Sequence, residues 1–297
     1  MNKLSNILSH LVASLVGLMA RLPLPLLHVV SSVLAFLMGD VVRYRRRVVL
    51  TNLRRAFPEK SEAEIRRIAR AFYRHLADVV AETIKLLRIS DGEMMRRCRI
   101  SEEGTALLQN HFDKGGSLIG LLGHFGNWEW VPPVVSLSLP FPVIPAYRPL
   151  KNKVFDRLML RIRGRYSHDL VPKKTVGRAM IRYLRSEKPF IMGLIADQTP
   201  RPQTAYWTTF LSQETPVYSG PEKLARSTNT PVFFVALRRQ RRGHYVLHVV
   251  LMSERPAELV EGELSKRFMA LLEEEIRRAP AHWLWSHKRW KHKRQES

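Results

Sequence analysis

The chain has 297 residues, of which 45% are hydrophobic. That length allows one large globular domain or two small ones, and the composition excludes a disordered protein. It carries 49 Lys and Arg residues against 26 Asp and Glu residues, a net charge of +23. So large an excess favours polyanionic partners: nucleic acid, anionic lipid headgroups or an acidic protein. Cys98 is the single cysteine, which excludes a disulfide within the chain and agrees with a reducing compartment.

The N-terminal segment, residues 1–50, differs in kind from the rest. Between residues 4 and 39 the only charge is Arg21, and no small-residue cleavage site of a signal peptide follows the apolar run. The uncharged stretch 22–39 is just long enough to cross a bilayer, and the arginines that follow at 43–47 would hold their flank on the cytoplasmic side. We expect membrane attachment, either as one span or in the interface. The alternative is a buried helical hairpin packed on the rest of the protein.

The chain after residue 50 alternates between helical and strand patterns. Residues 59–87 predict a helix, because Ser61 and Glu64 have the spacing of a capping box before a helical apolar repeat. Short apolar runs predict buried strands at 117–122, 142–147, 189–196, 231–237 and 245–251. Helical patterns occupy 153–164, 177–186, 220–228 and 262–278. This alternation predicts an α/β domain over 51–297, with a mainly parallel or mixed sheet flanked by helices.

The sequence GHFGNWEW ends the first predicted strand with ionisable side chains. On a continuous helix His124 and Glu129 would point about 140° apart, and on a continuous strand they would lie on opposite faces. They can meet only if the backbone turns between them, which Gly123 and Gly126 permit. With Asn127 as an N-cap, Glu129 would lie in the first turn of a following helix.

Such a pair is suited to proton transfer. A neutral histidine can take a proton from a hydroxyl near neutral pH, and a carboxylate on its other ring nitrogen fixes the tautomer. The pair would also lie at the carboxyl end of a strand, where open α/β sheets bind ligands. The alternative is a buried histidine bonded to a backbone carbonyl, with Glu129 exposed.

Four motifs carry a family resemblance. GHFGNWEW resembles the His-x4-Asp/Glu motif of the glycerolipid acyltransferase superfamily in its glutamate form. The sequences AYRPLKN, LIADQTP and HWLWSHKRWK follow in the order found in the late acyltransferases of lipid A biosynthesis, which transfer lauroyl and myristoyl chains. Together with the N-terminal apolar helix, these motifs make the chain similar to that family over nearly its whole length.

The resemblance implies a reaction and a location. The family transfers a fatty acyl chain from acyl carrier protein to a hydroxyl of a lipid A precursor, in lipopolysaccharide biosynthesis. It implies a membrane-associating segment at 1–50, an acyltransferase catalytic domain at 51–297, and a place on the cytoplasmic face of the bacterial inner membrane, against its anionic surface. No covalent acyl-enzyme is expected, which agrees with the absence of a Gly-x-Ser-x-Gly motif.

The resemblance also assigns expected roles to five residues. His124 would deprotonate the acceptor hydroxyl, and Glu129 would orient its ring. Arg148 and Arg163 are candidates for holding phosphate, since the planar guanidinium binds phosphate at two points. Asp197, at the end of a later predicted strand, would hold one of these arginines or shape the acceptor site.

Other interpretations stay open. The acceptor could be a lysophospholipid, an amino-acid lipid or another glycolipid. A non-catalytic basic module would explain the charge and the tail WSHKRWKHKR, whose tryptophans suit a lipid interface or a segment packed on the core. That interpretation leaves the strand-end cluster unexplained, so we expect no nucleic-acid partner. We expect no metal or cofactor, because His244 and His248 have no carboxylate or thiolate nearby in sequence and the glycines fit no nucleotide fingerprint.

Overall fold

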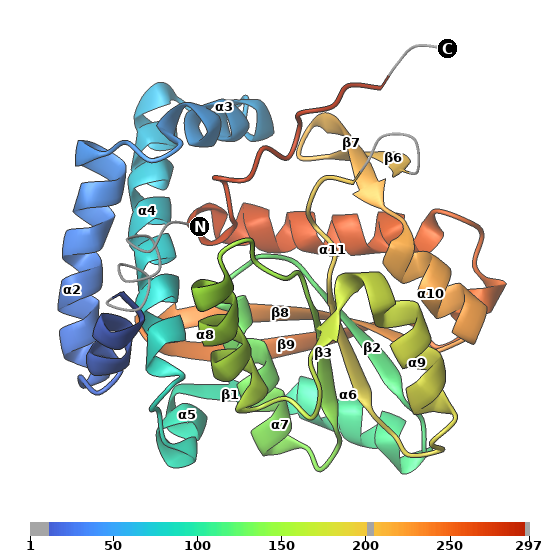
Figure 1. Cartoon of the computed structure of the whole chain (residues 1–297). Helices are drawn as coiled ribbons and strands as arrows, with labels where there is room; N and C mark the ends of the chain where they lie inside the picture. Colours follow the sequence, from blue (N-terminus) through green and yellow to red (C-terminus); the bar gives the residue numbers. More distant parts are fainter. Residues whose placement is uncertain (1–11, 201–204, 295–297) are drawn as a thin grey trace.

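The computed structural model describes residues 12–200 and 205–294 and is built around a seven-stranded sheet (Figure 1). In spatial order the strands are β1 (Cys98–Ile100), β9 (His244–Ser253), β8 (Val232–Arg241), β2 (Leu118–Leu122), β5 (Ile191–Ile195), β3 (Val143–Tyr147) and β4 (Val171–Pro172). All neighbours pair in parallel except β8 and β9, which form an antiparallel hairpin. The five predicted strands and the mainly parallel sheet are therefore confirmed.

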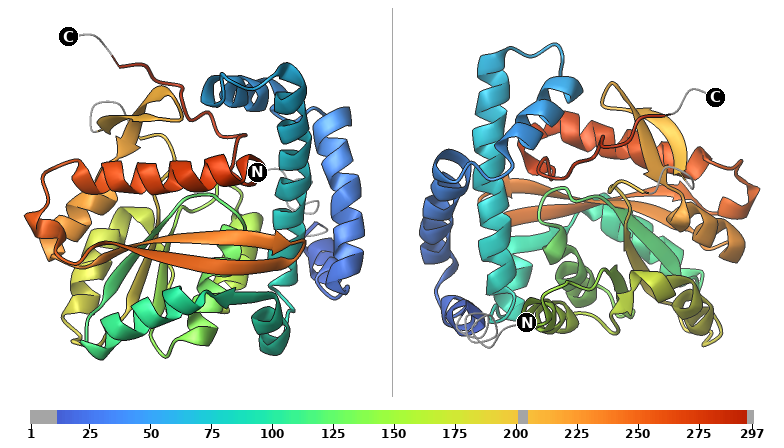
Figure 2. Two further views of the ribbon diagram at one scale, coloured as in Figure 1. Left: turned by 180° about the vertical axis from the view of Figure 1, so that it is seen from behind. Right: turned by 45° about the horizontal axis from the view of Figure 1, so that its top comes forward.

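Helices cover both faces of the sheet (Figures 1 and 2). One face packs against α11 (Glu263–Arg278), α9 (Val176–Leu184) and α10 (Gly220–Thr228). The other packs against α6 (Glu102–Asp113), α7 (Val131–Ser138) and α8 (Lys153–Gly164). Strand β2 is buried on both faces, which explains why its sequence is continuously apolar and not alternating.

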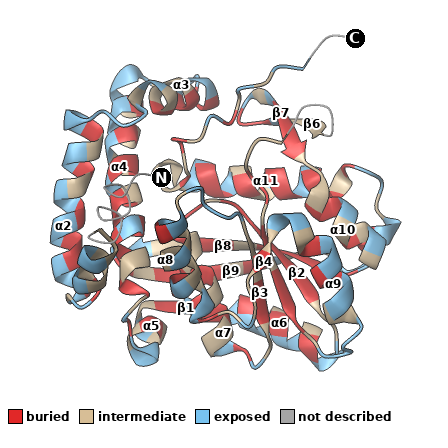
Figure 3. Ribbon diagram, in the orientation of Figure 1, coloured by how far each residue is buried: buried red, intermediate tan, exposed pale blue. Residues whose placement is uncertain are grey.

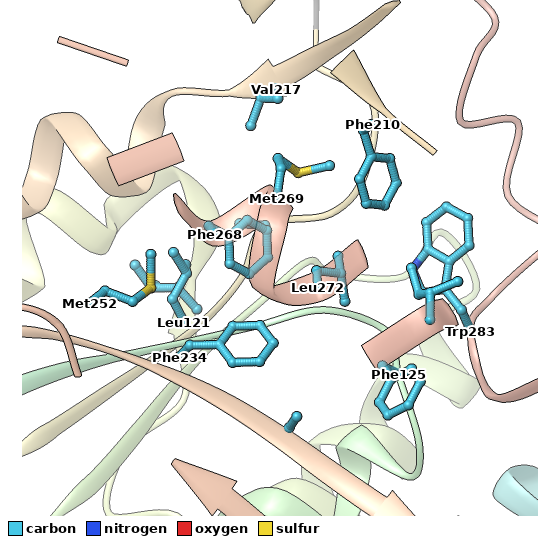
Figure 4. Packing of buried hydrophobic residues seen from close by; sticks show 14 of the residues in the cluster. Leu121, Phe125, Phe210, Val217, Phe234, Met252, Phe268, Met269, Leu272 and Trp283 are labelled. Carbon is cyan, nitrogen blue, oxygen red and sulfur yellow. The ribbon is translucent and has the colours of Figure 1, made fainter. Parts of the chain in front are cut away.

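The core on the α11 face is formed by side chains of the sheet, of α11 and of the segment that follows α11. Leu121 and Phe234 of the sheet point toward Phe268 and Leu272 of α11, and all four are buried (Figure 4). Trp283, which follows α11, closes this cluster (Figure 4). Burial of each of these large side chains contributes roughly 1.5–3 kcal/mol to the stability of the fold.

Short polar elements were not predicted. Strand β1 is preceded by α5 (Asp91–Arg97), and a separate antiparallel pair is formed by β6 (Ala205–Phe210) and β7 (Gln213–Tyr218). These segments are too short or too mixed in polarity to show a strand pattern in the sequence. After residue 87 the chain forms α5 and α6, which β1 separates.

A three-helix unit flanks the sheet at the turn that joins β8 to β9 (Figure 2). It consists of α2 (Leu24–Phe36), which continues into a π-helical turn (Leu37–Val41), α3 (Arg46–Ala56) and α4 (Glu62–Lys85). The predicted capping box of α4 is present: the Glu64 amide donates to Ser61 Oγ, and Glu64 Oε2 accepts from the Ser61 amide. Helix α2 packs along α4 and exposes its other side (Figure 3).

Within the described residues, one helical stretch, Leu24–Val41, is long and apolar enough to cross a membrane, and a third of it is buried. Helix α2 is therefore buried only where it contacts α4. The buried helical hairpin, which was the alternative to membrane attachment, describes that side of the helix alone. The tail behaves differently from the expected lipid interface. Trp283 and Trp285 are 2% and 0% exposed, so the packed-segment interpretation is the correct one. Their indole N–H groups donate to internal acceptors, which lets both rings be buried.

Candidate active site

The loop that carries His124 is shaped by one glycine. Gly126 has φ +62°, a conformation that other residues adopt at a cost. A Cβ atom built at Gly126 would lie 1.8 Å from the carbonyl oxygen of Leu237 in β8. The chain can therefore turn sharply between β2 and the next helix only because this position has no side chain.

Backbone contacts from distant segments hold the loop in place. The Gly126 amide donates to the carbonyl of His282 at 3.0 Å, and the Leu284 amide donates to the carbonyl of His124 at 3.2 Å. From α4, His75 Nε2 donates to the Gly126 carbonyl at 3.1 Å. The segment after α11 thus runs antiparallel to the loop and fixes its backbone from one side.

The ring of His124 is bonded to Asp197. Nδ1 of His124 lies 2.6 Å from Oδ1 of Asp197, and the backbone amide of His124 donates to Oδ2 at 2.8 Å. Trp283 Nε1 donates to the same Oδ2 at 2.8 Å. One carboxylate therefore orients both the ring and the backbone of His124, and Nδ1 carries the proton that it donates. The ring nitrogen left to accept a proton is Nε2.

Strand order explains why these two residues meet. Leu122 of β2 pairs with Ile195 of β5 in parallel register, and His124 and Asp197 each follow their strand by two residues. Carboxyl ends of adjacent parallel strands lie at one edge of a sheet, so the two side chains converge there. The sequence placed Asp197 correctly at a strand end, but it did not show that β5 lies beside β2.

The predicted hydrogen bond between Glu129 and His124 is wrong. Residues Trp128–Trp130 form a 3-10 turn, and the Glu129 carboxylate faces Arg163 of α8 instead. Arg163 donates to it through Nε at 2.9 Å and Nη2 at 2.6 Å. Trp128 connects the two groups, because its ring meets the His124 ring edge-on with centroids 5.0 Å apart and its Nε1 donates to Glu129. Asp197 therefore takes the orienting place predicted for Glu129.

Two further predicted contacts differ in the structure. Asp197 does not hold an arginine, because its oxygens accept from His124 and Trp283. Asn127 precedes the 3-10 turn, as expected of an N-cap, but its side chain donates to Glu82 at 2.7 Å and caps nothing. Arg163 was expected to hold phosphate and is paired with Glu129, so a phosphate ligand would have to share its guanidinium.

The surroundings of the site shift the pKa values of Asp197 and Arg163 toward their charged forms. Burial opposes ionisation of Asp197, but the adjacent His124 ring and the three N–H donors outweigh burial and lower its pKa to about 2. Burial likewise opposes the charge on Arg163, and the bond to Glu129 outweighs it and raises the pKa of Arg163. Both side chains of this ion pair are largely buried: Glu129 is 10% exposed and Arg163 is 25% exposed.

A cavity of about 1630 Å³ opens beside His124 and extends along the α6 and α7 face of the sheet. Its inner wall is apolar and is lined by Leu118, Leu122, Val143, Ile191, Phe233 and Val249. Gly120 and Gly193 are paired directly across β2 and β5, and both line this wall. Because neither has a side chain, space remains above the middle of the sheet. His124, Glu129 and Arg163 all lie in the same lining.

The outer part of the cavity is cationic. Its basic lining residues are Arg148, Lys151, Arg163, Lys173, Lys174, Lys223 and Lys291, and Glu129 is the one carboxylate in the described lining. Lys173 lies 3.7 Å from the centroid of the Tyr218 ring, a cation–π contact. Burial and the charge of Arg148 both lower the pKa of Lys173. Arg148, the predicted phosphate ligand, belongs to this basic lining, and its role stays a prediction.

This cavity, with the His124–Asp197 pair beside it, fits a family match over the chain. Residues 1–292 match the family described as bacterial lipid A biosynthesis acyltransferase. The chain belongs to this family. The acyltransferase is 24% identical over 288 residues to a lipid A biosynthesis lauroyltransferase of Escherichia coli (strain K12), covering 92% of this chain and 88% of that relative.

Two further relatives are similar to the acyltransferase at the same coverage, 92% of this chain and 88% of each relative. They are a lipid A biosynthesis palmitoleoyltransferase of Escherichia coli (strain K12) and a lipid A biosynthesis acyltransferase of Shigella flexneri, each 21% identical over 291 residues. The acyltransferase therefore acts in lipid A biosynthesis, as the four motifs predicted.

The sequence did not reveal two residues of the site. Gln198 Nε2 lies 3.4 Å from His124 Nε2 on the cavity side. Trp283 supports Asp197 from behind. Both belong to segments that the family motifs had marked, LIADQTP and HWLWSHKRWK. A strand-end Asp-Gln pair is therefore the signal that could have pointed to Gln198.

Proposed function

We propose that the acyltransferase moves a fatty acyl chain from acyl carrier protein to a hydroxyl of a lipid A precursor, with His124 as general base. The observation that supports this most directly is the bond from His124 Nδ1 to Asp197, which leaves Nε2 as the proton acceptor beside the cavity. A general base must lie within hydrogen-bond reach of the hydroxyl it deprotonates. The rim of the cavity beside Nε2 provides room for that hydroxyl.

In the proposed reaction Nε2 takes the hydroxyl proton while the hydroxyl oxygen attacks the thioester carbonyl carbon. A tetrahedral oxyanion forms, and its collapse breaks the carbon–sulfur bond. The thiolate of the carrier then takes the proton back from Nε2. Asp197 stays ionised throughout, because its pKa of about 2 is far below neutral pH, and it stabilises the imidazolium between the two proton transfers.

The oxyanion needs a preorganised donor. Gln198 is our candidate for this donor. Its side-chain nitrogen is 3.4 Å from His124 Nε2 and so lies near the point where the carbonyl would react. A neutral amide donor in a partly buried site stabilises the developing charge without reorganisation.

The shape of the cavity supports a fatty acyl donor. The apolar wall between the sheet and α6 and α7 suits an acyl chain whose thioester lies at His124. The cationic mouth suits the phosphates of a lipid A precursor and the acidic surface of acyl carrier protein. Arg148 remains our candidate for a phosphate ligand, and Arg163, held by Glu129, would border the acceptor. Membrane attachment through residues 1–50 would place the mouth at the cytoplasmic face of the inner membrane.

The test is an assay of the purified full chain with acyl carrier protein thioesters and a defined lipid A precursor. We expect acylated lipid A and free carrier thiol in equal amounts, and at least a thousandfold loss in His124→Gln. His168→Gln is the matched control, because His168 lines neither described cavity. Full activity of His124→Gln would refute the base. Transfer to a lysophospholipid in preference to the lipid A precursor would refute the acceptor.

A further inference from the structure

A second cavity, of about 600 Å³, lies between the three-helix unit and the turn that joins β8 to β9, and His124 is not among its lining residues. Six arginines line it: Arg46 of α3, Arg66, Arg70 and Arg74 of α4, Arg239 of β8, and Arg242 of the turn. Asp40 and Asp78 are the only carboxylates in the described lining. No role in acyl transfer accounts for this concentration of positive charge.

The carboxylates of the cavity pair with only two of its six arginines. Asp78 is 2% exposed and already binds two of them, Arg239 at 3.0 Å and Arg242 at 2.6 Å. Asp40 forms no ion pair within 4.0 Å among the described residues. Among the residues that the structure describes, Arg70 and Arg74 have no carboxylate partner. Arg66 has only a 4.0 Å contact with the exposed Glu62. The cavity therefore presents arginines whose charge no protein group balances.

The arrangement of the arginines suits a phosphate. Arg66, Arg70 and Arg74 are four residues apart on α4, so they share one face of the helix at intervals of about 6 Å. Guanidinium groups bind phosphate oxygens through two parallel N–H donors. An anion in the cavity would meet these three side chains of α4, while Arg239 and Arg242, which line the same cavity, already donate to Asp78.

Beside the cavity lies an unpartnered apolar surface on α2 (Figure 3). Val29, Val33 and Phe36 are 62%, 57% and 58% exposed, and Leu26, Val30 and Leu37 continue the same stripe. Phe36 belongs both to this stripe and to the lining of the cavity, whose floor includes Ala35, Gly39 and Leu50. A ligand with a phosphate and hydrocarbon chains would bind the two surfaces together, with the phosphate at the arginines and the chains along α2.

We propose that this cavity binds the phosphodiester headgroup of one anionic phospholipid from the bilayer in which the α2 stripe inserts. The occupant follows from charge complementarity and from the continuity of the cationic and apolar surfaces. The inference rests on the membrane attachment in the proposed function and on none of its chemistry. Binding at such a site is saturable and specific for one headgroup. A general electrostatic attraction to negatively charged surfaces has neither property.

The test is native mass spectrometry of the full chain. The protein is released from detergent micelles that contain either phosphatidylglycerol or phosphatidylcholine, and the lipid that stays bound to it is measured. We expect one retained phosphatidylglycerol per chain and no retained phosphatidylcholine. Arg70→Gln with Arg74→Gln should weaken retention at least tenfold. The control is Arg99→Gln with Arg185→Gln, which removes the same charge from two exposed arginines outside the cavity, and it should stay within twofold of wild type.

Equal loss in both double variants, or equal retention of the two lipids, would overturn the proposal. Displacement of the lipid by inorganic phosphate at low concentration would identify a free-phosphate site instead and would overturn it as well. Arg70→Lys with Arg74→Lys keeps the charge and removes the planar fork, so retention should still fall. His124→Gln should retain lipid normally, which separates a failure of this proposal from a failure of the proposed reaction.

Discussion

Replacing Asp197 by Asn tests the orientation of the base. The wild-type carboxylate accepts from His124 Nδ1 at 2.6 Å, from the His124 amide at 2.8 Å and from Trp283 at 2.8 Å. An asparagine has one acceptor oxygen, and its NH2 group would face an N–H donor on the other side. The ring would lose its counter-charge and its fixed tautomer, for which losses of about 10³–10⁴-fold in kcat are typical, or roughly 4–5.5 kcal/mol.

The same substitution has a separate effect on stability. The pKa of Asp197 falls from 3.8 to about 2 on folding, which corresponds to about 2 kcal/mol. Because the folded pKa is the lower one, this contribution is complete above about pH 4 and is lost as the pH falls toward 2. The difference in unfolding free energy between wild type and Asp197→Asn should therefore shrink on acidification.

The assay is single-turnover acyl transfer at saturating substrate, with urea unfolding of both proteins at neutral and acidic pH. Activity within tenfold of wild type would refute the role of Asp197 as orienting group. A stability difference that does not change between neutral pH and pH 2 would refute the assignment of the low pKa to this carboxylate.

Three further substitutions probe the rest of the site. Glu129→Gln, which removes the carboxylate that Arg163 binds, should lower kcat/KM about ten- to hundredfold. A double-mutant cycle with Arg163→Gln should show a coupling energy of about 1–3 kcal/mol. Additive effects of the two substitutions would contradict the ion pair. Gly193→Leu should shift competition assays toward donors two carbons shorter by roughly 15-fold, since each buried methylene contributes about 0.8 kcal/mol. A Cβ there meets only Pro145, at 3.5 Å, so the first atom of the new side chain fits, and urea titration checks that the variant folds. Gly126→Ala should lower the free energy of unfolding by about 3 kcal/mol or more, measured by urea titration. Gly177→Ala, with nothing within 4 Å of its Cβ, is the control and should be neutral or stabilising.

The strands and the position of His124 in a turn at a strand end could be predicted from the sequence, because both depend on local patterns. Continuous apolar runs identified β2 and β5, and the glycines beside His124 identified a sharp turn at a strand end. The partner of His124 could not be predicted in this way, because it depends on which strand lies beside β2. Asp197 is distant in sequence and becomes adjacent only through the order β2–β5.

The sequence left the position of the tail open for a related reason. A sequence of alternating tryptophans and cations has the composition of a lipid interface, yet Trp283 is buried because Asp197 accepts its N–H. Arg289 is also fully buried, with its Nη1 donating to the carbonyl of Pro216. Composition indicates where such residues are usually found, and internal acceptors decide where these ones are. The α2 helix shows the opposite case, because its apolar stripe has no internal partner.

The contacts of Trp283, His282 and Leu284 with the His124 loop have a consequence for synthesis on the ribosome. The histidine emerges early, and its carboxylate partner follows after β5, but the segment that supports both is made more than 80 residues after Asp197. A nascent chain would have most of its sheet translated while the loop still lacked its backbone partners. Acyl transfer should therefore begin only when the final tryptophans have left the exit tunnel, so truncated products that reach the membrane would bind there without reacting.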